Sequence, residues 1–269
     1  MIAVITGAGS GIGAAAALEL AKRGYRLVLV GRTPEKLAGV ADRIASVTET
    51  RPDTITADFA SLDQVRYLAD QLLRRYDDIH VLINNAGVMT SQRRITADGH
   101  ELIMQVNHLA PFLLTNLLFD RLKFASARVI STSSIAAYSG TIDPSDLSRE
   151  RRWWNSWLQY FDSKQANALF TVSLAERGLN ATCFHPGVVR TPFAGDTLTM
   201  KLMLMIPGLA KPPATAAARL VHLVTHDDGI NHPGRFFMGN GPAWVPRRMK
   251  DPELAEALWE ASCAATGLR

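Results

Sequence analysis

The sequence predicts a doubly wound α/β fold, in which about seven strands form a parallel sheet that helices cover on both faces. Two observations support this prediction. Short β-branched runs alternate with longer helical stretches along the whole chain, and several of the short runs are almost continuously hydrophobic. Strands buried on both faces have this composition, and strand–helix alternation implies right-handed crossovers between parallel strands.

The strands are expected at the apolar and β-branched runs, of which the last is the weakest. They are Ile2–Thr6, Leu27–Gly31, Thr54–Ala57, Val81–Asn84, Arg128–Thr132, Ala181–His185 and Gly234–Met238. Helices are expected between them. Thr33 is a possible N-cap directly before one of these, and another starts with the capping residue Ser61. The expected helices are Gly11–Arg23, Pro34–Ser46, Ser61–Tyr76, Gly99–Phe124, Trp153–Arg177, Pro213–Thr225 and Pro252–Thr266.

The chain is expected to form one domain over residues 1–269. Its 269 residues, of which 47% are hydrophobic, suffice for one large core. The most irregular stretch is 188–211, and long irregular segments in compact α/β domains are commonly functional. We therefore expect residues 188–211 to form a lid over a substrate site.

Charge and composition exclude several classes of protein. The formal net charge is +4, and the basic residues are scattered along the chain. The one dense run, Arg149–Arg152, contains Glu150 and is expected to be a solvated face, so no nucleic-acid partner is predicted. Two cysteines cannot build a disulfide framework, and the sequence has neither a signal-peptide pattern nor a membrane-spanning run. We expect a cytoplasmic protein.

A glycine-rich turn joins the first strand to the first helix. It reads Thr6-Gly7-Ala8-Gly9-Ser10-Gly11-Ile12-Gly13. Residues without Cβ let the backbone turn tightly and approach a ligand, and a helix N-terminus offers free N–H groups to phosphate. A glycine turn without a ligand is the alternative, but the position between strand and helix favours a Rossmann-type dinucleotide site. Gly7, Ser10, Gly11, Ile12 and Gly13 are therefore expected to contact the cofactor.

The end of the second strand predicts which nicotinamide dinucleotide binds. NAD-binding folds of this type place an acidic residue there to bind the adenine ribose hydroxyls. Here Gly31 occupies that position and Arg32 follows it. A guanidinium suits a 2′-phosphate, whereas an ordinary exposed arginine is the alternative. We expect NADP(H) as the cofactor, with NAD(H) less favoured.

At this point the chain resembles the short-chain dehydrogenase/reductase family, because six motifs occur in the family's order. They are Thr6-Gly7-x-x-x-Gly11-x-Gly13, Asp58, Asn84-Asn85-Ala86-Gly87, Asn107, Ser134 with Tyr160-x-x-x-Lys164, and Pro186-Gly187-Val188-Val189-Arg190-Thr191. A narrower similarity is to the retinol-dehydrogenase-like branch, as in Val106-Asn107-His108-Leu109 and Ser163-Lys164-Gln165-Ala166-Asn167. The resemblance implies an oxidoreductase that moves a hydride between the nicotinamide and a carbonyl or alcohol carbon.

The catalytic residues follow from the chemistry and from this resemblance. Tyr160 and Lys164 lie four apart on an expected helix, so their side chains share one face. A nearby ammonium lowers the pKa of a phenol, and we assign Tyr160 as the general acid for reduction and the general base for oxidation. Ser134, with Ser133 as the rival, is expected to hold the substrate oxygen. The resemblance implies that Asn107 holds a water that links Lys164 to solvent; a helix-packing hydrogen bond is the alternative.

The resemblance also implies the other cofactor contacts. Asp58 and Phe59 are expected at the adenine, and Asn85, Ala86 and Gly87 at the adenine ribose. The ribose of the nicotinamide is expected at Tyr160 and Lys164. Further contacts are expected from Pro186, Gly187, Val189 and, to the carboxamide, Thr191.

The substrate is expected to be a bulky apolar carbonyl or alcohol. The pocket should form from residues 88–96, 135–157 and 188–211, which supply many aromatic and methionine side chains. Among them are Met89, Tyr138, Trp153, Trp154 and Trp157. The same residues could instead pack the lid or an oligomer interface, and a homo-oligomer, a dimer or tetramer, is expected through the helices at Gly99–Phe124 and Trp153–Arg177.

Two other functions stay open at this stage. The bound nicotinamide could serve a net non-redox step, such as epimerisation or internal hydride transfer. Alternatively, the chain could bind a dinucleotide without catalysis, although Asn107, Ser134, Tyr160 and Lys164 together speak against this.

No metal site is predicted. His222 and His226 lie four apart on an expected helix, which fits a zinc pair in geometry. The sequence indicates no third ligand nearby, so a surface helix face is the preferred interpretation.

Overall fold

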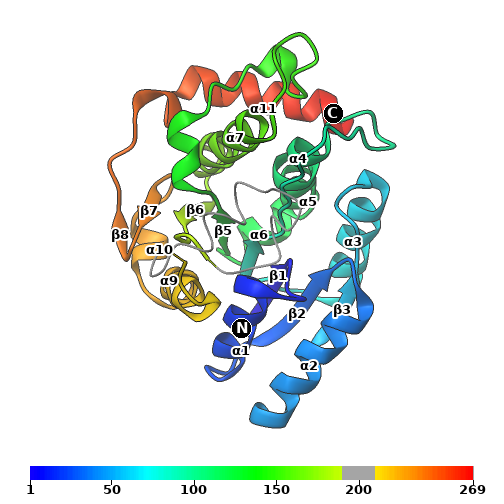
Figure 1. Cartoon of the computed structure of the whole chain (residues 1–269). Coiled ribbons are helices and arrows are strands. Elements are labelled where there is room, and N and C mark those ends of the chain that lie inside the picture. The colour runs from blue at the N-terminus through cyan, green and yellow to red at the C-terminus, as the bar shows by residue number, and fades with distance from the viewer. Residues whose placement is uncertain (190–209, 269) are drawn as a thin grey trace.

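The computed structural model describes residues 1–189 and 210–268, and these residues form a single sheet between two layers of helices (Figure 1). The sheet has the order β3-β2-β1-β4-β5-β6-β7-β8. The strands are β1 (Ile2–Thr6), β2 (Arg26–Gly31), β3 (Asp53–Thr56), β4 (Val81–Asn84), β5 (Arg128–Thr132), β6 (Asn180–His185), β7 (Phe236–Met238) and β8 (Gly241–Pro242). The first seven are parallel and β8 pairs antiparallel with β7, so the predicted doubly wound fold is confirmed.

Alternate residues of each central strand face opposite layers. Ala3 and Ile5 of β1 pack against the layer formed by α1 (Gly11–Ala21), α2 (Pro34–Thr48) and α9 (Pro213–Thr225). Val4, between them, packs against the layer that includes α3 (Leu62–Arg75), α5 (Ala110–Leu117) and α7 (Ser156–Glu176). The strand order reverses between β1 and β4, which places a ligand crevice at their carboxyl ends.

The prediction of one helix over Gly99–Phe124 is wrong. The segment contains α4 (Leu102–Met104), a π-helical turn η1 (Gln105–Leu109), α5 and α6 (Phe119–Phe124). The chain enters α4 only after Glu101, whose carboxylate caps the helix by accepting a hydrogen bond from the N–H of Met104. Leu118 leaves helical geometry between α5 and α6.

The stretch before α7 also differs from the prediction. The helix begins at Ser156 rather than Trp153, because the side chain of Asn155 accepts a hydrogen bond from the N–H of Trp157 and caps it. The prediction of a solvated face at Arg149–Arg152 is wrong for Arg149. Its side chain is 6% exposed and its Nε lies 2.8 Å from Oδ2 of Asp162, which is fully buried on α7.

The C-terminal helix α11 (Pro252–Thr266) lies across α7 and α5 at the top of Figure 1. Trp259 packs against Phe112 and Phe170, with ring centres 5.0 and 6.0 Å away. Ser262 Oγ lies 2.9 Å from His108 Nε2. The parts of α5 and α7 that α11 covers are not free to contact a second copy, and homo-oligomerisation stays a prediction.

Most of the lid predicted at 188–211 lies outside the described residues. Its two ends are described and lie side by side: Val189 and Lys211 form a parallel bridge, and the N–H of Lys211 donates to the carbonyl of Val188 at 2.8 Å. The segment therefore leaves and re-enters the domain at one point beside β6. No helix of the described part is long and apolar enough to cross a membrane.

Candidate active site

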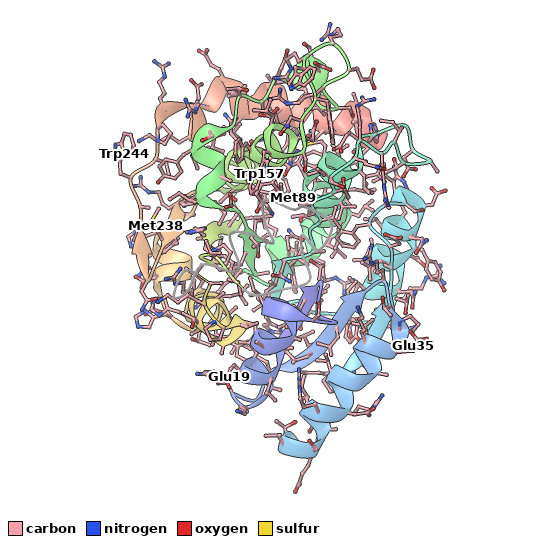
Figure 2. The ribbon with its side chains drawn as sticks, viewed as in Figure 1. Glu19, Glu35, Met89, Trp157, Met238 and Trp244 are labelled. Carbon is pink, nitrogen blue, oxygen red and sulfur yellow. The ribbon has the colours of Figure 1, made fainter. Side chains whose placement is uncertain are left out.

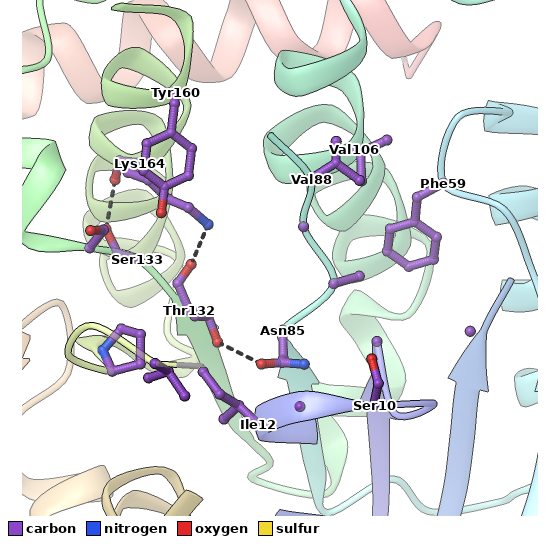
Figure 3. Close-up of a pocket in the computed structure, with 18 of the residues that line it drawn as sticks. Ser10, Ile12, Phe59, Asn85, Val88, Val106, Thr132, Ser133, Tyr160 and Lys164 are labelled. Atoms are coloured by element: carbon purple, nitrogen blue, oxygen red, sulfur yellow. Dashed lines mark hydrogen bonds between the residues drawn. The ribbon is translucent and has the colours of Figure 1, made fainter. Parts of the chain in front are cut away.

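A cavity of about 810 Å³ opens at the carboxyl ends of the strands, at the reversal between β1 and β4 (Figure 3). It extends from the glycine turn and the end of β2 to α7 and the loop after β6. Its lining includes all but one of the predicted cofactor residues that the structure describes. They are Gly7, Ser10, Gly11, Ile12, Arg32, Asp58, Phe59, Asn85, Ala86, Gly87, Tyr160, Lys164, Pro186, Gly187 and Val189. Thr191 lies outside the described residues.

The glycine turn is held against the loop after β4. Thr6 Oγ1 accepts hydrogen bonds from the N–H groups of Asn85 and Ala86, at 2.9 and 3.0 Å, and donates to the carbonyl of Ile83. Gly7 has a φ of +67°, and a Cβ there would lie 2.9 Å from Cα of Ala86. No larger residue fits this position. The turn thus forms a backbone cradle at the start of α1, which fits a pyrophosphate.

Gly13 is the described exception, because it does not line the cavity. A Cβ at Gly13 would lie 2.5 Å from the carbonyl oxygen of Gly7 and 2.8 Å from Nδ2 of Asn85. Its absence of a side chain lets α1 pack under the glycine turn. Gly13 therefore shapes the cradle rather than forming its surface.

The end of β2 carries more positive charge than the sequence analysis identified. Arg32 lines the cavity as expected, and Lys36, one turn into α2, lines it too. Both side chains are exposed, and neither pairs with an acidic side chain within the described residues. The sequence did carry a sign of this pair, because Arg32 and Lys36 are four residues apart at the start of α2. The two cations together fit a 2′-phosphate.

Tyr160 and Lys164 lie one turn apart on α7 and are both almost fully buried (Figure 3). Lys164 Nζ lies 5.5 Å from the centre of the Tyr160 ring and donates to the carbonyl of Thr132 at 3.0 Å. The same carbonyl accepts a bond from Asn167 Nδ2 at 3.3 Å. The end of β5 thus fixes the ammonium beside the phenol.

The electrostatics of this pair differ from the expectation. Burial raises the pKa of Tyr160 to about 12, and the opposing influence is a hydrogen bond with Ser134 rather than the Lys164 charge. Burial also lowers the pKa of Lys164 to about 8. Burial therefore dominates the pKa of Tyr160 in this structure. Tyr160 holds its proton at neutral pH, as a general acid must.

Ser133 and Ser134, the two candidates for the serine at the substrate oxygen, have different hydrogen-bond partners. Ser133 is buried, and its hydroxyl donates to the carbonyl of Lys164 at 2.7 Å. Both serines line the cavity, but Ser134 is half-buried and shares a hydrogen bond with Tyr160. Ser134 is therefore the serine that pairs with Tyr160 at the cavity, and its role in holding a substrate oxygen stays a prediction.

His185 is a residue whose role the sequence analysis missed. It lines the cavity, and its Nδ1 accepts a hydrogen bond from the N–H of Ile135 at 3.2 Å. Burial lowers the pKa of His185 to about 4, so the ring stays neutral and can accept this bond. The histidine thereby holds the backbone directly after Ser134.

Asn107 lies in the π-helical turn η1, a feature that often occurs at functional sites. Its Oδ1 accepts from the N–H of Val88 at 2.7 Å, and its Nδ2 donates to the carbonyl of Val88 and to Ser163 Oγ, both at 3.1 Å. Asn107 does not line the cavity. Its amide connects the loop after β4 to the turn before Lys164, and its proposed water-holding role stays a prediction.

The substrate side of the cavity is apolar. Tyr138, Trp157 and Phe161 contribute aromatic rings, and Trp157 meets Tyr160 edge to face at 6.4 Å. Of the other aromatic and methionine side chains expected in the pocket, Trp153 is 78% exposed, while Met89 and Trp154 pack beside Tyr160 without lining the cavity. Figure 2 places Met89 and Trp157 near the centre of the molecule, and Trp244 at its margin.

The premise that His222 and His226 have no third ligand nearby is wrong. Asp228, the first residue of α10 (Asp228–Asn231), lies against both rings. Sequence spacing on the helix gave no sign of it, because the chain turns back at His226.

A comparison with protein-family models decides the relationship. Residues 1–201 match the model described as short chain dehydrogenase. The chain belongs to the short-chain dehydrogenase/reductase family. The resemblance predicted from the motifs is therefore confirmed, and with it the interpretation of the protein as an NAD(P)-dependent oxidoreductase of this family.

Two curated relatives in this family cover almost the whole chain. "Putative daunorubicin C-13 ketoreductase DnrU" of Streptomyces sp. (strain C5) is 42% identical over 266 residues, covering 98% of this chain and 92% of the relative. Human "Retinol dehydrogenase 13" is 36% identical over 284 residues, covering 98% of this chain and 84% of the relative. The predicted likeness to the retinol-dehydrogenase-like branch is confirmed.

Solved structures of similar chains share the fold. An uncharacterised protein from Mycobacterium paratuberculosis has a TM-score of 0.80 and 33% identity, covering 99% of this chain and 93% of its own. A short chain dehydrogenase of Escherichia coli CFT073, complexed with NADPH, has a TM-score of 0.69 and 26% identity, covering 88% and 95%.

Proposed function

We propose that the protein is an NADP(H)-dependent ketoreductase for a bulky, apolar ketone, with Tyr160 as the general acid. The observation that carries the proposal is the position of the buried Tyr160, between Ser134 and Lys164 at the apolar end of the dinucleotide cavity. Reduction of a ketone forms an alkoxide that needs a proton.

Bound NADPH would supply the hydride to the carbonyl carbon. Ser134 holds the carbonyl oxygen through its hydroxyl, and Tyr160 transfers its proton to that oxygen as negative charge develops. The Lys164 ammonium lies beside the phenol and stabilises the phenolate that remains. The backbone cradle at Gly7 and the cations at Arg32 and Lys36 would hold the phosphates.

The bulky substrate is inferred from the wall of the cavity. Trp157 and Phe161 lie 5.9 Å apart on one face of α7, and Tyr138 and Ile135 face the same space. Large aromatic surfaces favour large apolar ligands. The streptomycete relative is named as a ketoreductase of daunorubicin, which is consistent with this size class.

Substitution of Tyr160 tests the reaction. In Tyr160→Phe, we expect kcat for NADPH-dependent reduction of bulky aromatic ketones to fall by about 10²–10⁴, because the acid is lost. NADPH affinity, measured by fluorescence titration, should change by less than about threefold. The matched control is Tyr138→Phe, which removes a hydroxyl of the same cavity that donates to the carbonyl of Trp244. Equal loss in both variants would contradict the assignment.

The same assay separates the remaining alternatives. Product formation without steady NADPH consumption would indicate a net non-redox reaction instead. Cofactor binding with no turnover on any carbonyl would favour a binding protein.

Cofactor choice is tested at the end of β2. In the double variant Arg32→Ala/Lys36→Ala, we expect NADPH affinity to fall by at least about tenfold, since even one charge-assisted hydrogen bond contributes about 1.5–3 kcal/mol. NADH affinity should stay within about twofold. Arg43→Ala on the same helix, outside the cavity, is the control. An equal loss for both dinucleotides would remove the basis for NADP(H) preference.

A further inference from the structure

A cluster of three potential metal ligands lies at the end of α9, away from the dinucleotide cavity. His222 lies in the last turn of α9, His226 follows that helix directly, and Asp228 begins α10. One ligand atom from each residue lies within 4.8 Å of the others. None of the three lines the cavity.

The distances between the ligand atoms suit a small divalent ion. His226 Nδ1 lies 3.4 Å from Asp228 Oδ2, and His222 Nε2 lies 2.8 Å from the same oxygen. In a tetrahedral zinc site with bonds of about 2.0–2.1 Å, ligand atoms are about 3.3 Å apart. The His222–Asp228 contact would have to lengthen by about half an ångström, and the two imidazole nitrogens already lie within 4.8 Å of each other.

The surroundings keep the three groups together. The rings of His222 and His226 stack with centres 4.5 Å apart. Arg128 donates to the carbonyls of Leu223 and His226, which fixes the backbone where α9 ends.

The chemistry of the donors selects the ion. Two imidazoles and one carboxylate are zinc ligands, and a hard ion such as Mg²⁺ prefers oxygen alone. His226 is 63% exposed, so a water can occupy the fourth position. We propose that His222, His226 and Asp228 form a zinc-binding site that joins the end of α9 to α10.

This site has a structural effect rather than a catalytic one. A bound ion would cross-link the end of α9, where Arg128 already holds two carbonyls, to the turn that follows. An ion that binds only the folded state stabilises it by RT ln(1 + [L]/Kd), where [L] is the concentration of the free ion. The inference is independent of the ketoreductase proposal.

The test uses tag-free protein freed of metal by dialysis against a chelator. Titration with Zn²⁺ should give saturable one-to-one binding by calorimetry, and a hundredfold excess over Kd should raise Tm by about 5 °C. Mg²⁺ should give no shift. Co²⁺ should give visible absorption of the strength typical of tetrahedral coordination.

Substitutions locate the ion. His222→Ala and Asp228→Asn should each weaken zinc binding by at least about tenfold without changing NADPH affinity. His232→Ala is the matched control, because its Nε2 lies 4.0 Å from Asp228 Oδ1 outside the triad; Cys263→Ser controls for a half-buried thiol. Absence of saturable binding, or full binding retained by His222→Ala and Asp228→Asn, would overturn the proposal.

Discussion

Two buried cations, Arg149 before α7 and Lys164 on α7, have different hydrogen-bond partners. Arg149 lies in the loop before the helix, and its Nε, Nη1 and Nη2 donate to Asp162, to the carbonyl of Trp153 and to Thr141 Oγ1. Lys164, half a turn beyond Asp162, donates to a single carbonyl, that of Thr132. No carboxylate of the described residues pairs with Lys164.

The difference separates a structural charge from a functional one. A buried ion needs a counter-ion and full hydrogen bonding to offset its desolvation. Arg149 has both, so it holds the loop onto α7. Lys164 has neither, which is reflected in its lowered pKa, and its ammonium borders the cavity instead. Perturbed groups of this kind mark functional sites.

The largest effect on stability is expected from breaking the buried ion pair of Arg149 and Asp162. Arg149→Met leaves the Asp162 carboxylate buried without its main counter-ion. Arg152, whose Nη2 lies 3.7 Å from this carboxylate, can compensate only in part. We expect the free energy of unfolding to fall by about 3 kcal/mol, at the lower end of values for broken buried pairs. Urea denaturation followed by circular dichroism measures it.

Arg151→Met is the control for this prediction. Arg151 is exposed, and within the described residues its guanidinium donates only to Ser145, so the loss should stay within about 0.5 kcal/mol. Similar losses in the two variants would mean that the loop, rather than the buried pair, determines the effect.

The same contrast explains how far the sequence alone could reach. The parallel sheet, the glycine turn and the pair Tyr160 and Lys164 depend on local patterns, namely hydrophobic runs, small residues at a strand end and a spacing of four. These predictions agree with the structure.

Pairings between distant or folded-back segments could not be predicted in this way. A basic run gives no sign that Arg149 will meet Asp162 across a loop, and His222 gives none that Asp228 will fold back onto it. Likewise the π-helical turn at Asn107 is associated with contacts to Val88 and Ser163, which belong to other elements. Each of these features is a tertiary contact, which periodicity does not encode.

An opposite effect on stability, of at most the same size, is expected from removing the ammonium of Lys164. Lys164→Met removes a buried ammonium, and the carbonyl of Thr132 keeps its bond from Asn167. A pKa lowered from 10.5 to about 8 corresponds to a cost of about 3 kcal/mol at pH 7, since one pKa unit is about 1.4 kcal/mol. We expect the variant to be up to that much more stable at pH 7, and to be inactive.

The pH dependence of the free energy of unfolding tests whether the Lys164 charge causes this difference in stability. Between pH 8 and 10.5 the unfolded chain binds a proton that the folded lysine has lost, so wild-type stability gains with rising pH from this group. Below pH 8 the full cost persists, and above 10.5 it vanishes. The stability advantage of Lys164→Met should therefore shrink across this window, as measured by urea denaturation at pH 7, 9 and 10.5. An advantage that is constant with pH would mean that the methionine acts through packing, and that the unmatched ammonium carries no cost.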